Sequence, residues 1–133
     1  MSPALLETVE AHVQVGRSRI LRGVSLRIEP GQAVGLVGET GCGKSMTVRA
    51  VTGLLPRIGG QVTAGTVTVD GHDMTHASER QWRAHQGKTV ALVPQASMSS
   101  LDPLMRVGKQ LTETIRRADR RADVPNQIKR SFV

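Results

Sequence analysis

Residues 38–45 constrain the fold of this chain more than any other segment, because they match the pattern GxxxxGK[ST] at every specified position. A short apolar run, residues 33–37, precedes them and predicts a strand that is buried on both faces. Residues 46–51 follow them and can continue as a helix. Strand, glycine loop and helix in this order are the context of a phosphate-binding loop. The loop comprises Gly38, Glu39, Thr40, Gly41, Cys42, Gly43, Lys44 and Ser45.

The residue types of this loop suit a nucleotide polyphosphate. Gly38, Gly41 and Gly43 let the backbone adopt conformations that a Cβ would forbid, so consecutive amide N–H groups can point at an anion. The loop also begins a helix, whose N-terminal N–H groups and dipole favour negative charge at the same place. We expect Lys44 to reach the β- and γ-phosphates and the Ser45 hydroxyl to bind the Mg²⁺ that bridges them.

The length and composition of the chain predict one cytosolic domain. The chain has 133 residues, of which 38% are hydrophobic, and this is enough for a single domain with a core. Its apolar stretches are far shorter than the ~18 residues of a membrane span, and its first residues show no signal-peptide pattern. A single cysteine, Cys42, excludes an internal disulfide and agrees with a reducing compartment.

The net charge of +7 raises the question of a nucleic-acid partner. Much of this charge lies in residues 113–133, where arginine and lysine outnumber the acidic residues. Bases stack on aromatic side chains, yet the chain has only Trp82 and Phe132 and no tyrosine. A solvated helix face followed by a frayed end therefore explains the charge better than a nucleic acid does. The other use for such a surface is contact with acidic lipid or an acidic membrane partner.

Four segments besides residues 33–37 carry the strand pattern. Residues 6–15 predict an edge strand, and residues 24–28 alternate apolar with polar side chains as a half-buried strand does. An antiparallel N-terminal portion follows from these two segments. Residues 65–69 and the tight turn at residues 70–71 predict a further strand. Residues 89–93 predict a second buried strand, which the following proline stops.

Helix ends are also marked in the sequence. Gly53 ends the helix that follows the phosphate loop. Ser78 and Gln81 have the spacing of a capping box, which predicts a short helix that carries Trp82 as a packing residue. From Val107 onward the apolar residues recur on one helical face.

Three further segments give the chain its resemblance to the ATP-binding subunit of an ABC transporter. Residues 20–32 look like the segment that leads into the phosphate loop in that family, and residues 70–74 look like its strand and turn before a short helix. Residues 93–95 look like its Q-loop, which follows a buried strand. The resemblance implies that Gln95 is a Mg²⁺ ligand and the link to the membrane subunit.

Residues 100–103 and 107–111 are similar to the peptide and nickel importer branch of this family, so uptake of dipeptides or oligopeptides is the expected function. The implied fold is α/β, a P-loop NTPase of the ABC type, with a mostly parallel sheet and an antiparallel N-terminal β portion. The implied cofactors are ATP, bound by residues 38–45 and Gln95, and Mg²⁺, bound by Ser45 and Gln95.

The resemblance also implies partners and a location. The partners are a second ATP-binding subunit, transmembrane permease subunits and, indirectly, a solute-binding protein. The location is cytoplasmic, at the inner face of the cell membrane. No nucleic acid is expected.

Two departures from the family pattern qualify these expectations. Val15, with Gly16 beside it, falls where the family usually places an aromatic that stacks on adenine, so a low affinity for ATP is expected. No LSGGQ-like signature, no apolar strand ending in Asp-Glu and no switch histidine follows Gln95. We therefore expect residues 1–133 to be a partial nucleotide-binding domain, with the Q-loop near residue 95, a helical region from about residue 104 and the C-terminal half missing.

Whether the chain is an enzyme stays open, because phosphoryl transfer to water needs the groups that those missing motifs supply. We expect no hydrolysis by the chain alone. Two alternatives remain, namely a nucleotide-binding or regulatory module without turnover, and another class of P-loop NTPase.

Overall fold

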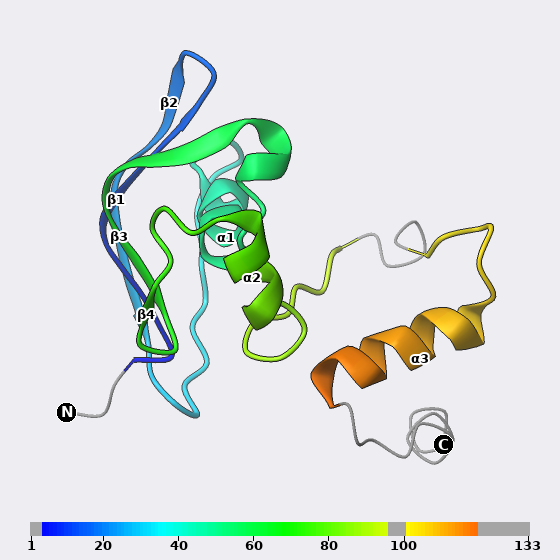
Figure 1. Cartoon of the computed structure of the whole chain (residues 1–133). Helices are drawn as coiled ribbons and strands as arrows, with labels where there is room; N and C mark the ends of the chain where they lie inside the picture. The colour runs from blue at the N-terminus through cyan, green and yellow to red at the C-terminus, as the bar shows by residue number, and fades with distance from the viewer. Residues whose placement is uncertain (1–3, 96–100, 120–133) are drawn as a thin grey trace. The chain divides into compact units, whose positions relative to one another are not determined.

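The computed structural model describes residues 4–95 and 101–119, which fall into two units, Met1–Thr89 and Val90–Val133. The first unit is built on a four-stranded antiparallel sheet with the strand order β2-β1-β3-β4 (Figure 1). The predicted antiparallel N-terminal portion is therefore confirmed. The strands are β1 (Leu6–Val15), β2 (Ser18–Ile28), β3 (Gly60–Val69) and β4 (His72–Asp73).

β1 is an interior strand, so the prediction of an edge strand for residues 6–15 is wrong. It pairs with β2 on one side and with β3 on the other. Its inward side chains Thr8, Ala11 and Val13 are buried. The pairing with β3 joins segments far apart in the sequence, and no local pattern in β1 can show it.

Helix α1 (Lys44–Thr52) packs against β1, β2 and β3, and it lies on the same side of the sheet as α2 (Figure 1). Ala50 and Val51 of α1 are buried with the strand residues Val13 and Val67 in the core. The helix ends at Gly53, whose φ of 74° places it in the left-handed region that suits a C-cap glycine. The predictions of a helix after the loop and of its end at Gly53 are confirmed.

A short 3-10 turn, η1 (Pro56–Ile58), leads from α1 into β3, and α2 (Glu79–His85) follows β4. The capping box of α2 is formed: the Gln81 amide donates to Ser78 Oγ at 3.4 Å, and the Ser78 amide donates to Gln81 Oε1 at 2.9 Å. Trp82 is 4% exposed, which confirms it as a packing residue.

The turn between β3 and β4 has positive φ at both central residues, 49° at Asp70 and 75° at Gly71. These values fit the hairpin turn that the Asp-Gly pair predicts. The carboxylate of Asp73 accepts a hydrogen bond from the Thr75 amide at 2.9 Å. Hydrogen bonds from the side chain and the backbone of Thr75 lower the pKa of Asp73.

The predicted parallel part of the sheet is not shown by the described residues. Residues 33–37 form no strand, and Val34, Leu36 and Val37 are 41%, 43% and 93% exposed. Residues 89–93, predicted as the second buried strand, form no strand either, and Val93 is 87% exposed. A buried parallel strand needs hydrogen-bonded neighbours and cover on both faces, and no strand of the described sheet pairs with either run. Both strand predictions are therefore wrong for this structure.

In the second unit, α3 (Val107–Ala118) forms where the helical pattern predicts it. The Gln110 side chain fixes the segment before it, because Nε2 donates to the Asp102 carbonyl at 2.9 Å and to the Met105 carbonyl at 2.8 Å. Ser100 and residues 120–133 of the basic tail lie outside the described residues. None of the helices within residues 4–95 and 101–119 has the length and apolar content that crossing a membrane requires.

Candidate nucleotide-binding site

The phosphate loop follows β2 and closes directly onto α1. Two of its glycines have positive φ, 85° at Gly41 and 100° at Gly43. Gly43 is the N-cap of α1, and a Cβ at this position would lie 2.6 Å from Cδ2 of Leu21 in β2. Any other residue here would therefore strain the backbone, and its Cβ would force the buried Leu21 side chain to shift. The Cys42 amide bonds back to the Glu39 carbonyl at 3.3 Å, which closes the curve of the loop.

The Lys44 ammonium folds back into this loop. Its Nζ donates hydrogen bonds to the carbonyls of Gly38 and Glu39, the latter at 2.6 Å. Sγ of Cys42 lies 3.6 Å from the same nitrogen. A positive charge is therefore held beside the first turn of α1, where the helix dipole also favours an anion. Phosphate oxygens are stronger acceptors for an ammonium group than neutral carbonyls are, so an entering phosphate can replace these two bonds.

Ser45 and Thr47, both in the first turn of α1, have different surroundings. The Thr47 amide and hydroxyl both donate to the Gly43 carbonyl, at 2.8 and 3.0 Å, and these bonds tie the loop to the helix. Ser45 is exposed, and its hydroxyl bonds to no group in the part of the chain that the structure describes. It is therefore free to bind a ligand next to Lys44.

The donor set at this position fits Mg²⁺ in a phosphate complex. Mg²⁺ keeps several water ligands and takes one or two protein oxygens together with substrate phosphates. The free Ser45 hydroxyl supplies one such oxygen. Among residues 4–95 and 101–119 no three histidine, cysteine or acidic side chains gather into a metal site. The fit therefore depends on Ser45 together with the nucleotide.

Gln95 and Val15 are the two residues expected to complete the site, and the described structure tests neither role. Gln95 is exposed and belongs to the second unit, so its role as a ligand stays a prediction. Val15 ends β1, where it pairs with Ser18 and Gly60. It is half-buried, and its role at the adenine position also stays a prediction.

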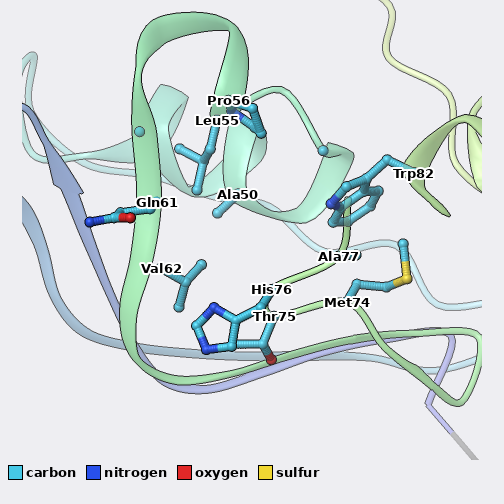
Figure 2. Close-up of a pocket in the computed structure, with 12 residues that line it drawn as sticks. Ala50, Leu55, Pro56, Gln61, Val62, Met74, Thr75, His76, Ala77 and Trp82 are labelled. Atoms are coloured by element: carbon cyan, nitrogen blue, oxygen red, sulfur yellow. The ribbon is translucent and has the colours of Figure 1, made fainter. Parts of the chain in front are cut away.

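A cavity of about 230 Å³ lies in the first unit beside the C-terminal end of α1, away from the phosphate loop at the other end of this helix. Figure 2 shows that Met74 and Ala77 approach it from the chain between β4 and α2, Trp82 from α2, and Ala50 and Leu55 from α1 and the segment after it. Sequence reasoning missed this cavity, because four separate segments of the chain form it and none of them carries a motif for it.

A phosphate-binding loop that opens α1 and packs against an antiparallel sheet defines the first unit as part of a P-loop nucleotide-binding domain. The profile of the ABC transporter family matches residues 21–132, and the chain therefore belongs to the ABC transporter family. This membership favours the ABC type over another class of P-loop NTPase and implies that the domain binds ATP.

The curated relatives are ATP-binding proteins of peptide transporters. Probable peptide ABC transporter ATP-binding protein y4tR of Sinorhizobium fredii is 38% identical over 98 residues, which cover 74% of this chain and 29% of that protein. Oligopeptide transport ATP-binding protein OppD of Bacillus subtilis is 36% identical over 100 residues, 75% of this chain and 28% of its own length. Dipeptide transport ATP-binding protein DppD of Lactococcus lactis subsp. cremoris is 31% identical over 124 residues, 93% of this chain and 35% of its own length.

The chain thus spans about a third of the length of these relatives. Among solved structures, a bacterial Atm1-family ABC exporter with ATP bound matches with a TM-score of 0.51 and 31% identity, over 68% of this chain and 14% of that chain. These matches agree with the antiparallel sheet and the helix α1 as a part of an ABC transporter NTPase domain.

Proposed function

We propose that this chain is the ATP-binding part of an ABC importer subunit, and that the whole subunit energises the uptake of dipeptides or oligopeptides. The observation that carries the proposal is the position of the Lys44 ammonium, held inside a glycine loop at the N-terminus of α1. The names of the three relatives, all ATP-binding proteins of peptide transporters, support the class of solute.

Binding begins when the polyphosphate of ATP exchanges with the two loop carbonyls that hold Lys44. The ammonium would then face the phosphate oxygens, and the amides of residues 38–45 could donate to the same oxygens. Gly41 and Gly43, with their positive φ, permit this inward direction of the amides. Thr47 keeps the loop fixed to α1 through its two bonds to the Gly43 carbonyl.

The exposed hydroxyl of Ser45 and the side chain of Gln95 are the proposed Mg²⁺ ligands. The ion, when bound, would supply positive charge that neutralises the phosphate oxygens. The exposure of Ser45 and its position one residue after Lys44, at the start of α1, support this role. The part taken by Gln95 rests on its position in the family's Q-loop.

The proposed partners follow from the same family. They are a second ATP-binding subunit, the transmembrane permease subunits and, through these, a solute-binding protein. The proposed location is the cytoplasmic face of the cell membrane. We expect selection of the peptide to lie in the permease and the solute-binding protein, since the site proposed for this chain is one for phosphate.

Calorimetric titration of the purified chain with Mg-ATP tests the nucleotide site. We expect saturable binding that is lost in Lys44→Ala. Lys88→Ala is the matched control, because it removes the same charge from an exposed lysine outside the loop. Equal affinities for the two variants would refute the assignment of Lys44.

Peptide uptake is tested with a chimera in which this chain replaces the matching segment of the Bacillus subtilis relative. Uptake of a labelled oligopeptide is expected in cells that carry the chimera, and its loss is expected when Lys44→Ala is added. A stable chimera that binds ATP but supports no uptake would contradict the peptide branch.

A further inference from the structure

Two side chains of the α2 region hold the C-terminal end of α1, whose other end carries the phosphate loop. Nε2 of Gln86 donates to the Thr52 carbonyl at 3.0 Å, across 34 positions of the sequence. The Trp82 ring lies against Gly53, so closely that a Cβ at Gly53 would overlap the ring atoms Cγ, Cδ2 and Cε3. No motif in the sequence indicates this contact.

The Gln86 bond satisfies a group that the helix itself leaves without a partner. The last carbonyls of an α-helix have no intrahelical donor, and they form the negative end of its dipole. Thr52 is 8% exposed, so water has little access to its carbonyl. A side-chain amide that donates here therefore fixes the end of α1 to the residue that caps α2.

A change at this end of α1 reaches the loop because the helix is short and continuous. Nine residues at about 1.5 Å per residue give α1 a length of roughly 13 Å. The loop is tied to its first turn by the two Thr47 bonds, and Lys44 is its first residue. A tilt of the helix at Thr52 would therefore move the Lys44 ammonium and the Gly43 carbonyl together.

The cavity beside α1 leaves this end of the helix room to shift. Ala50, Gly53 and Trp82 all line it, and Figure 2 shows the Trp82 ring at its border. Trp82 is also the single tryptophan of the chain. The fluorescence of this residue therefore reports on the contact between α2 and the end of α1.

We propose that Gln86 and Trp82 are positioning residues for nucleotide binding: they set the orientation of α1, and the contact they make changes when the loop takes up a polyphosphate. The proposal rests on the proposed nucleotide site. It adds two residues that do not touch the nucleotide but control how well the loop receives it.

The test combines Trp82 fluorescence with calorimetry on the purified 133-residue chain. Titration with Mg-ATP is expected to change Trp82 emission with the same midpoint as the heat signal, and Lys44→Ala is expected to abolish both. This measurement needs no variant at the contact itself, so a folding defect cannot decide its outcome.

Variants of Gln86 separate positioning from stability. Gln86→Ala is expected to weaken Mg-ATP binding by about three- to tenfold, the value of one hydrogen bond. Gln81→Ala is the matched control, since it removes the hydrogen bond from the Ser78 amide to Gln81 Oε1 at the other end of α2 without touching α1. We expect Gln81→Ala and Gln86→Lys, which keeps a donor, to bind within about twofold of the parent, and Gln86→Glu, which has none, to resemble Gln86→Ala.

The possible results distinguish the positioning role of Gln86 and Trp82 from the nucleotide site itself. Calorimetric binding with unchanged Trp82 emission, or equal affinities for Gln86→Ala and Gln81→Ala, would overturn the positioning role and leave the nucleotide site intact. Absence of calorimetric binding by the folded parent chain would overturn both the proposed function and this inference.

Discussion

Replacing Gly53 by alanine tests how tightly α2 holds the phosphate-loop helix. Gly53 has a φ of 74°, and an L-residue in this left-handed region costs about 1–2 kcal/mol. The new Cβ would also overlap the ring of Trp82, which is 4% exposed and has to move. Overpacking of this kind costs a further 1–3 kcal/mol, roughly. We therefore expect the free energy of unfolding to fall by about 2–5 kcal/mol.

The matched control is Gly59→Ala. Gly59 also caps a helix end in the left-handed region, with a φ of 68°, but a Cβ there meets nothing within 4 Å. This variant should lose only the backbone part, about 1–2 kcal/mol. Urea unfolding followed by circular dichroism measures both, and with a slope of about 1–3 kcal/mol per molar the two midpoints should be clearly separated. Equal midpoints for the two variants would refute the reasoning, because they would show that the Trp82 contact contributes nothing.

Four further outcomes are expected. Complete alkylation of Cys42, whose Sγ lies 3.6 Å from Lys44 Nζ, should abolish Mg-ATP binding in calorimetry; unchanged binding would contradict the crowding of the loop. Val37→Ser removes an apolar side chain that is 93% exposed and should reduce self-association in size-exclusion chromatography. A parent chain that elutes as a monodisperse monomer at micromolar concentration would show that this apolar surface does not cause association. The pKa of Asp73 is lowered by hydrogen bonds from Thr75, so the ionised carboxylate stabilises the fold above the pKa of the unfolded state, about 4, and this stabilisation is lost as the pH falls through the pKa of the folded state. The unfolding midpoints of the parent and of Asp73→Asn should therefore converge in acid. A difference between them that does not change with pH would contradict this reasoning. The 133 residues contain no LSGGQ-like segment, so the purified chain should show no steady release of phosphate from ATP, and release that Lys44→Ala abolishes would overturn that expectation.

The elements that the sequence predicts correctly are those specified by neighbouring residues. The start of α1 follows from glycines and a lysine within eight positions, residues 38–45. The capping box of α2 needs only Ser78 and Gln81, three positions apart. In each case the side chain and the backbone group it serves are local, so the pattern contains the whole interaction.

The elements predicted wrongly depend on partners elsewhere in the chain. Residues 33–37 have the composition of a buried strand, but a strand forms only where a neighbour supplies hydrogen bonds, and the described sheet offers none. β1 was predicted at an edge because its second neighbour, β3, begins beyond the phosphate loop and α1. Composition reveals that a segment prefers burial, but it does not reveal what buries it.

Trp82 shows how a local sequence pattern and a contact between distant segments act together. The capping box and the apolar side chain predict a packing residue, and its 4% exposure confirms this. Its partner is the backbone of Gly53, which the sequence marks only as the end of a helix. Gly53 ends α1 with a left-handed backbone conformation, and its lack of a Cβ leaves space for the Trp82 ring. The end of the helix and the aromatic contact therefore both require glycine at this position. That constraint acts on α1, so under this proposal the geometry of the phosphate loop depends on residues about forty positions further along the chain. A substitution at Gly53 or Gln86 is then expected to change the proposed nucleotide site as well as the core.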